Sequence, residues 1–331
     1  MKRVDFLAIG DTVVDEFVEL EDASVHCEVD TERCMISMRW GDKIPFKSAE
    51  LVAGVGNGAN AAVSAARLGI KSAILTNIGR DRDGDEALAA LKKEGLAMDY
   101  VKRHKDIPTN HHYVLSFDSE RTILVKHEAY PYEFPKNLPP PKTIYLTSLR
   151  QGTEAYHEQI ADYLEKHPDI YFVFQPGTFQ LKLGTEKLSR IYKRANLFVV
   201  NKEEAERILS HDQVQEIKTL FGGLHGLGVK SAIITDGRNG AYASDGSSMW
   251  FVPMYPDARA PKERTGAGDA FASTAAAALT LGKSLSEALL WAPINSMSVV
   301  QDIGAQRGLL YREDLLNYLS KAPAEYHVRP F

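Results

Sequence analysis

The chain has 331 residues, of which 44% are hydrophobic, so it can bury the core of one large α/β domain or of two smaller ones. Its formal net charge of −5 argues against a broad electrostatic surface for nucleic acid. The first ten residues lack the apolar run of a signal peptide, and the longest apolar helical stretch, near 270–281, is too short and too rich in Ala and Thr to cross a membrane. We therefore expect a cytoplasmic protein with neither a nucleic-acid nor a membrane partner.

The first half of the chain predicts strands and helices with one interruption. Residues 4–10 are typical of a buried strand, whereas 16–46 contains short alternating pieces, such as 34–38, that are typical of half-exposed strands. Further elements are expected as a helix at 58–68 ended by Gly69, a strand at 72–77, a helix at 86–94 ended by Gly95, and a hairpin of 109–117 and 121–127 that turns at 118–120.

The two cysteines, Cys27 and Cys34, fall within the interruption. A structural zinc site usually needs four ligands, and His26 is the one other good candidate nearby. The sequence favours two free thiols in a reducing compartment over a zinc site.

The second half of the chain alternates more regularly, after a Pro-rich connection at 131–141. Strands are expected at 143–147, 170–174, 197–200 and 231–235, and helices at 154–166, 185–194, 202–209, 269–281, 286–300 and 312–320. This alternation predicts an α/β fold with a mainly parallel central sheet that helices cover on both faces.

The strand-rich pieces 16–47 and 99–128 are explained most simply as one small sheet built from both. Such a sheet would cover a site at the strand ends of a core formed by 1–15, 48–98 and 129–331. Two unrelated surface hairpins are the alternative.

Residues 264–271 read Arg-Thr-Gly-Ala-Gly-Asp-Ala-Phe, a glycine loop that opens an apolar helix. A helix start leaves backbone N–H groups unpaired and attracts anions, and glycine lets the anion approach. Asp269 would oppose a bound anion, which makes sense if it takes a proton from a nucleophile that attacks a phosphate. Alternatively, Asp269 stabilises its own helix start.

A second glycine loop, 53–60, opens the helix at 58–68. Gly54, Gly56 and Ala59 also fit a dinucleotide-binding fingerprint, but the strand before them is short and the next strand ends in the neutral Asn77. Asn57 and Asn60 suit the hydroxyls of a polyol better, because an amide both donates and accepts.

Asp11 and Asp15 follow the first strand, where a carboxylate could accept two sugar hydroxyls or could sit in a polar turn. The chain contains no Gly-x-x-x-x-Gly-Lys-Ser/Thr phosphate loop, so phosphoryl transfer would need another scaffold.

In this order, the motifs resemble those of the ribokinase-like, or PfkB, family of carbohydrate kinases over nearly the whole chain. The segments that carry the resemblance are 56–60, 79–84, 201–204, 235–240, 265–271 and 304–306. The resemblance implies a ribokinase-like fold in which the small sheet is a lid over the substrate, and in some members the lid also forms a homodimer interface.

The resemblance also implies roles for individual residues. Asp269 would be the general base, and the amides of Gly266, Ala267 and Gly268 would form an anion hole. Asn201 and Glu204 would position hydrated Mg²⁺. The sugar would be held by Asp11, Asp15, Gly56, Asn57 and Asn60, and ATP would be contacted by Asn201, Thr235, Gly237, Gly240, Thr265, Gly268 and Asn295.

Many members bind K⁺ beside the anion hole. The equivalent positions here are Glu263, Thr265, Val299, Asp302 and Gly308, which would act mostly through backbone carbonyls. Glu263 replaces an Asp that is commoner at its position, which does not exclude a site made of main-chain ligands.

Other departures concern the acceptor. Val55 replaces the first glycine of a pair that often acts as the hinge of the lid, and Asn57 stands where ribose-specific members often have Lys, which weakens ribose as the substrate. Arg121, Lys126 and His127 would meet a substrate phosphate or lie in solvent.

We therefore expect an ATP- and Mg²⁺-dependent kinase, with K⁺ as a further cofactor, that phosphorylates a primary hydroxyl of a sugar or sugar-like compound. A nucleoside is the main alternative acceptor, for which Phe17, Trp40 and Phe46 could supply a slot for the base. A nicotinamide-dependent oxidoreductase and a catalytically silent sugar sensor are less favoured alternatives.

Overall fold

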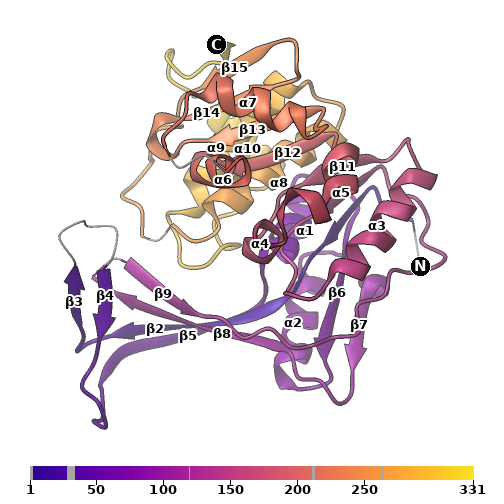
Figure 1. Cartoon of the computed structure of the whole chain (residues 1–331). Coiled ribbons are helices and arrows are strands. Elements are labelled where there is room, and N and C mark those ends of the chain that lie inside the picture. Colours follow the sequence, from indigo (N-terminus) through magenta and orange to yellow (C-terminus); the bar gives the residue numbers. More distant parts are fainter. Residues whose placement is uncertain (1–2, 28–33, 119, 211–212, 263) are drawn as a thin grey trace.

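The computed structural model describes residues 3–27, 34–118, 120–210, 213–262 and 264–331. Two sheets form its frame (Figure 1). A ten-stranded sheet has the order β16-β15-β14-β13-β12-β11-β10-β1-β6-β7, and a four-stranded sheet with the order β5-β2-β8-β9 projects from the main body. No helix in the described part of the chain is long and apolar enough to cross a membrane.

The strands of the large sheet are β1 (Phe6–Ile9), β6 (Ser72–Gly79), β7 (Val101–His104), β10 (Thr143–Leu146), β11 (Tyr171–Phe174), β12 (Leu197–Asn201), β13 (Ser231–Thr235), β14 (Ala241–Ser244), β15 (Met249–Val252) and β16 (Arg329–Pro330). Every pair from β7 to β13 is parallel, as the alternation predicts. The remaining pairs, from β13 to β16, are antiparallel, an edge that the sequence pattern did not predict.

The helices are α1 (Asn57–Arg67), α2 (Arg82–Lys93), α3 (Glu154–Lys166), α4 (Thr178–Lys187), α5 (Ser189–Arg194), α6 (Lys202–Ile208), α7 (Ile217–Gly226), α8 (Ala267–Thr280), α9 (Leu285–Val299) and α10 (Arg312–Ser320), with 3₁₀ turns at Met98–Tyr100 and Gly237–Asn239.

Helices cover the large sheet on both faces, which confirms the predicted layers. Phe6 and Ala8 of β1 belong to one core, with residues of α1, α8 and α9, whereas Leu7 and Ile9 belong to a second core, with residues of α3, α5 and α7. This division follows from the alternation of side chains along a strand. Since parallel strands end at one edge of the sheet, the loops after β1, β11, β12 and β13 converge there.

The four-stranded sheet consists of β2 (Val13–Leu20), β5 (Phe46–Val55), β8 (Asn110–Phe117) and β9 (Glu120–Leu124). It draws strands from both strand-rich pieces, which confirms the expected small separate sheet. β2 begins before residue 16, β5 continues to Val55, and residues 101–104 pair instead with β6 of the large sheet. Ser119, in the predicted hairpin turn, lies outside the described residues.

A hairpin of β3 (Ser24–Cys27) and β4 (Cys34–Ser37) lies near the far end of the four-stranded sheet (Figure 1). Cys27 and Cys34 are joined by a disulfide, so the expectation of two free thiols is wrong. The antiparallel register places the two cysteines opposite each other with their Cα atoms 4.0 Å apart. That register brings the sulfurs together, and the local sequence carries no signal for it.

Candidate active site

Asp269 lies in the first turn of α8 and meets the first turn of α1. Asn57 Nδ2 donates to Asp269 Oδ1 at 2.8 Å, and Asn60 Nδ2 donates to Oδ2 at 2.9 Å. Burial raises the pKa of Asp269 above its ordinary value, while these amide donors oppose the rise. The site therefore contains a half-buried carboxylate that neutral amide groups hold in place.

A third amide reaches Asp269 from the loop after β11. Gln175 Nε2 donates to Asp269 Oδ1 at 3.4 Å, and the hydroxyl of Tyr145 on β10 donates to Gln175 Oε1. Burial and the nearby charge of Asp269 raise the pKa of the Tyr145 phenol. Tyr145 therefore stays protonated and can orient the Gln175 amide toward the carboxylate.

Glycine is required at two turns of the site. Gly266 has φ +80°, and a Cβ there would lie 2.4 Å from Ala305 Cβ. Gly56 has φ +103°, and a Cβ there would lie 2.6 Å from the Asp11 carbonyl oxygen. Each glycine lets a helix start pack against a neighbouring loop. The N–H groups of Ala267 and Gly268 have no acceptor within α8, and the Ala267 N–H makes only a long turn contact, 3.4 Å, to the Arg264 carbonyl oxygen.

The carboxylate of Asp11 is buried after β1 and is bonded by the protein itself. Oδ1 accepts from the Tyr132 hydroxyl at 2.6 Å, and Oδ2 accepts from the Arg150 backbone N–H at 2.9 Å and from His127 Nδ1 at 3.1 Å. His127 thus faces Asp11 and not open solvent. These three partners lie far along the chain from Asp11, and no local sequence signal joins them.

Asp15 lies on β2 beside His112 of β8, because the parallel register pairs their Cα atoms. His112 Nδ1 lies 3.3 Å from Asp15 Oδ1. Both Asp15 Oδ1 and His112 Nε2 are buried and have no hydrogen-bond partner among the described residues. His112 was not predicted as a site residue, since the strand pairing that brings it to Asp15 is not local.

A cavity of about 410 Å³ opens beside the start of α8. Its lining includes six of the residues that the sequence implied for ATP or the anion hole: Asn201, Thr235, Gly237, Gly240, Ala267 and Gly268. An apolar wall is formed by Pro253, Met254, Phe271, Pro293, Met297 and Val300. This wall has the chemistry of a slot for a flat aromatic group.

Asn295 does not line this cavity. Its side chain is completely buried, donates to Thr274 Oγ1 at 2.7 Å and accepts from the Leu310 N–H at 2.8 Å. The side chain thus connects α8 and α9 to the segment before α10.

Asn201 and Glu204 cap the start of α6 reciprocally. Asn201 Oδ1 accepts from the Glu204 N–H at 2.7 Å, and Glu204 Oε2 accepts from the Asn201 N–H at 3.0 Å. Burial raises the pKa of Glu204, and the charge of Asp269 contributes to the rise. The capping bond occupies one carboxylate oxygen, and the second, Oε1, can receive a further donor.

Among the residues implied for K⁺, Val299 ends α9 and Gly308 of the following loop packs closely against it. A Cβ at Gly308 would lie 2.5 Å from the Ser298 carbonyl oxygen and 2.7 Å from Val299 Cα. Asp302 pairs with Arg259 at 3.1 Å. Thr265 lies in the turn before α8, and Glu263 lies outside the described residues.

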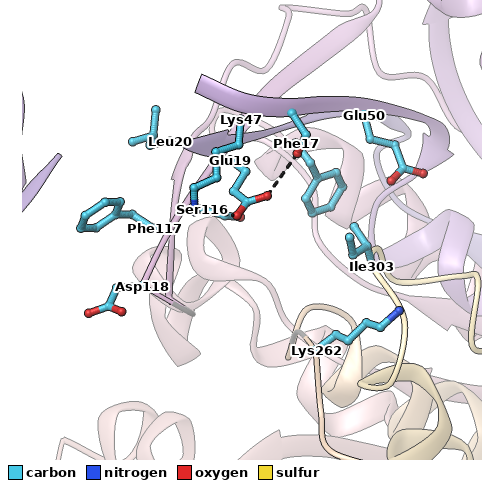
Figure 2. A pocket seen from close by; sticks show the side chains of 11 residues that line it. Phe17, Glu19, Leu20, Lys47, Glu50, Ser116, Phe117, Asp118, Lys262 and Ile303 are labelled. Atoms are coloured by element: carbon cyan, nitrogen blue, oxygen red, sulfur yellow. Dashed lines mark hydrogen bonds and ion pairs between the residues drawn. The ribbon is translucent and has the colours of Figure 1, made fainter. Parts of the chain in front are cut away.

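A second groove, of about 400 Å³, lies between the four-stranded sheet and the loops that carry Lys262 and Ile303. Figure 2 shows Phe17 of β2 and Ile303 on the same side of this groove, and Glu19 near Lys47. Trp40 and Phe46, the other two aromatics proposed for a base slot, are 101% and 57% exposed and do not line it.

Comparison with known proteins assigns the chain to a class. The model of the pfkB family of carbohydrate kinases matches residues 26–310. Ribokinase from Bacillus subtilis is 28% identical over 286 residues, which are 85% of this chain and 92% of the relative. The chain therefore belongs to the pfkB carbohydrate kinase family, as the motifs predict.

Solved structures agree on the fold. A nucleoside kinase of the ribokinase family from Methanocaldococcus jannaschii superposes with a TM-score of 0.80 at 19% identity, covering 97% of this chain and 100% of the other. Ribokinase from Arabidopsis thaliana, complexed with ribose and ATP, has a TM-score of 0.79 at 21% identity and covers 96% and 99% of the two chains. At these identities the likeness concerns the fold, which confirms the ribokinase-like architecture.

Proposed function

We propose that this kinase transfers the γ-phosphoryl group of ATP to a hydroxyl, preferably a primary one, of a sugar or sugar-like acceptor. The observation that carries the proposal is the Asp269 carboxylate, which Asn57 and Asn60 hold at the start of α8, directly after the Ala267 and Gly268 that line the 410 Å³ cavity. The cavity thus offers a slot for a nucleotide, and we assign the hydroxyls of the acceptor to the Asp15–His112 pair.

In the proposed mechanism, Asp269 accepts the proton of the acceptor hydroxyl as its oxygen attacks the γ-phosphorus of ATP. An oxygen–phosphorus bond forms, the bond to the bridging β,γ-oxygen breaks, and ADP leaves with that electron pair. The N–H groups of Gly266, Ala267 and Gly268 face the negative charge that develops on the phosphoryl oxygens. The amides of Asn57, Asn60 and Gln175 orient the base throughout.

The Asn201–Glu204 pair has the chemistry of a site that binds Mg²⁺ through the water molecules of the ion. Glu204 retains one oxygen beyond its capping bond, and an acceptor of this kind suits a water of hydrated Mg²⁺. The ion would neutralise phosphate charge when bound. Thr235, Gly237 and Gly240 would contact the nucleotide beside this pair.

A K⁺ site is proposed at Thr265, Val299, Asp302 and Gly308, with Glu263 as a fifth ligand residue. The close packing of Gly308 against the end of α9 at Ser298 and Val299 supports it, because backbone carbonyls are suitable ligands for K⁺. Replacing K⁺ with a bulky organic cation should lower turnover severalfold. Equal rates in the two salts would reject the site.

For the acceptor, Asp15 is the better candidate of the two aspartates near β1. Its Oδ1 has no hydrogen-bond partner in the part of the chain that the structure describes, whereas Asp11 already accepts three hydrogen bonds from the protein. Gly56, Asn57 and Asn60 complete the proposed sugar site. We assign Asp11 to holding this site together through His127 and Tyr132.

A nucleoside acceptor is the second candidate, and the groove in Figure 2 favours it. Phe17 lies two residues after Asp15 on β2, on the same face of the strand, and Ile303 adds a second apolar group. A nucleobase against Phe17 would leave its ribose near Asp15.

The glycine loop 53–60 does not support the oxidoreductase alternative. Its first residues are the end of β5, a strand of the four-stranded sheet, whereas a dinucleotide fold requires this loop to follow a strand of the parallel sheet. We further propose a cytoplasmic protein that dimerises through the four-stranded sheet, whose exposed Phe46, Tyr113, Ile123 and Leu124 offer apolar surface.

The test is ADP release from Mg·ATP over hexoses, pentoses, keto-deoxy acids, sugar phosphates and nucleosides, with Asp269→Asn as the control. A strong signal on one acceptor, lost in the variant, would support the reaction and identify the substrate. Silence while ATP binds would favour a sensor. Activity that persists in Asp269→Asn would reject the assigned base.

A further inference from the structure

The loop 304–309, after α9, contacts several parts of the site. Ala305 packs behind Gly266 at the proposed anion hole, and Arg307 forms an ion pair with Glu50 of the four-stranded sheet. Between them, Gln306 turns its side chain toward α1. Its Nε2 donates to the Gly54 carbonyl oxygen at 2.9 Å and to Asn60 Oδ1 at 3.0 Å. Gln306 therefore reaches the residue that bonds Asp269.

The orientation of the Gln306 and Asn60 side-chain amides is determined by their partners, the Gly54 carbonyl and the Asp269 carboxylate. The Gly54 carbonyl only accepts, so the Gln306 group that faces it must be the NH₂ group. The Asn60 atom that faces the same NH₂ group must then be the oxygen, which leaves the Asn60 NH₂ for the Asp269 carboxylate. A reversed Asn60 amide would place its oxygen against a carboxylate oxygen, and the two would repel each other.

The backbone of Gln306 is held from the other end of α1. Arg67 Nη1 donates to the carbonyl oxygens of Gln306 at 2.8 Å and Leu309 at 2.7 Å. The Arg67 guanidinium also forms two 2.8 Å hydrogen bonds to Glu94, in a pair whose side chains are only 12% and 18% exposed. One helix thus anchors the loop at its last residue and receives the Gln306 side chain at its first turn.

We infer that Gln306 is a positioning residue, which fixes the Asn60 amide so that it donates to Asp269 and keeps the proposed base ionised and oriented. The inference rests on the proposed role of Asp269 as the base. The hydrogen bond from Asn60 lowers the pKa of Asp269 against the effect of burial. Losing it raises that pKa, so the fall of kcat/KM at acid pH moves to higher pH.

Other titratable groups face this cluster. Glu204 and Tyr145 feel the charge of Asp269, Arg67 and Glu94 adjoin the Gln306 backbone, and His112 and His127 lie at the acceptor side. Among the described residues, none of these groups hydrogen-bonds the Gln306 side chain. If Gln306 variants shift the fall of kcat/KM at acid pH (the acid limb of the pH profile), that shift therefore reports on Asp269.

Two variants distinguish polarity from shape. Gln306→Leu removes the donor, whereas Gln306→Glu keeps the size of the side chain but presents an acceptor. In Gln306→Glu the Asn60 amide is expected to reverse and turn its oxygen toward Asp269. We expect kcat to fall roughly tenfold in Gln306→Leu and further in Gln306→Glu, with the acid limb shifted upward in the same order and KM for ATP unchanged. A purely structural role predicts the opposite order, because Glu is closer to Gln in shape.

A double-mutant cycle with Asn60→Ala completes the test. If Gln306 acts through Asn60, Gln306→Leu should have little further effect in the Asn60→Ala background. Gln213→Leu, the same change at an exposed position, serves as the control, and thermal melts verify folding. Wild-type kinetics in both Gln306 variants, or effects that simply add in the cycle, would overturn the inference while inactivity of Asp269→Asn left the proposed function standing. Full activity of Asp269→Asn would overturn both.

Discussion

The start of α8 and the loop after β1 each hold a buried or half-buried carboxylate, but the partners differ in kind. Asp269 accepts from three side-chain amides, none of which carries a charge or an acidic proton. Asp11 accepts from a phenol, an imidazole and a backbone N–H. Amides thus orient a carboxylate and leave it able to take up a proton, whereas the partners of Asp11 fix it as a structural acceptor.

The same substitution at both sites tests this difference most strongly. Asp269→Asn should lower kcat by roughly three orders of magnitude or more while ATP binding survives, because the base is lost and the glycine turn remains. Asp11→Asn should instead destabilise the fold by about 2–4 kcal/mol, because its new NH₂ group faces protein donors. Steady-state kinetics and thermal melts of both variants check the contrast. Equal kinetic losses in two stable proteins would contradict it.

The acceptor side offers the second largest effect. Asp15→Ala should raise KM for the acceptor roughly 10- to 100-fold and leave KM for ATP unchanged, because a hydrogen-bonding group of the proposed sugar site is lost. Initial rates with each substrate varied in turn measure the two constants. A change confined to ATP would move Asp15 out of the sugar site.

A smaller effect is expected at Glu204, the carboxylate that caps α6. Glu204→Gln keeps an oxygen for the Asn201 N–H but removes the charge, so the Mg²⁺ concentration for half-maximal rate should rise roughly tenfold. A Mg²⁺ titration at fixed ATP is the measurement. An unchanged titration would count against a metal role for Glu204.

The pH dependence of the wild-type enzyme gives the mildest test. A base works only when ionised, and burial raises the pKa of Asp269. We therefore expect kcat/KM to fall, as the pH is lowered, at a higher pH than an ordinary aspartate would give. The effect on the free energy of unfolding is opposite to the effect on activity. As pH falls through the raised pKa, Asp269 becomes neutral, the cost of burying its charge disappears, and the folded state gains stability. A flat kcat/KM down to the ordinary aspartate range would reject the pKa argument.

Much of the fold could be predicted because its elements have local sequence signals. The apolar runs of β1, β10 and β12 and the glycines that follow α1 and α2 indicate the alternation from which a parallel sheet follows. The antiparallel strands β14, β15 and β16 were missed, since short strands at a sheet edge carry little periodicity. The Cys27–Cys34 bond was missed because it depends on a hairpin register.

The candidate site divides in the same way. Asp269 and its glycine turn stand together in the sequence, so a single segment predicts them. Asn60 and Gln175 reach Asp269 from distant segments, and Gln306 reaches Asn60 from a third, a contact that no local sequence pattern indicates. His112 reaches Asp15 only through the pairing of β2 with β8.

The sequence by itself determined the local conformations, the family and the two glycine turns, because backbone sterics and nearest-neighbour patterns act within a few residues. Only the tertiary structure decided which donors face each carboxylate, that Asp15 lies beside His112, and that the two cysteines lie opposite each other. These contacts depend on the relative positions of whole helices and strands. Those positions result from the packing of two cores that draw residues from the full length of the chain.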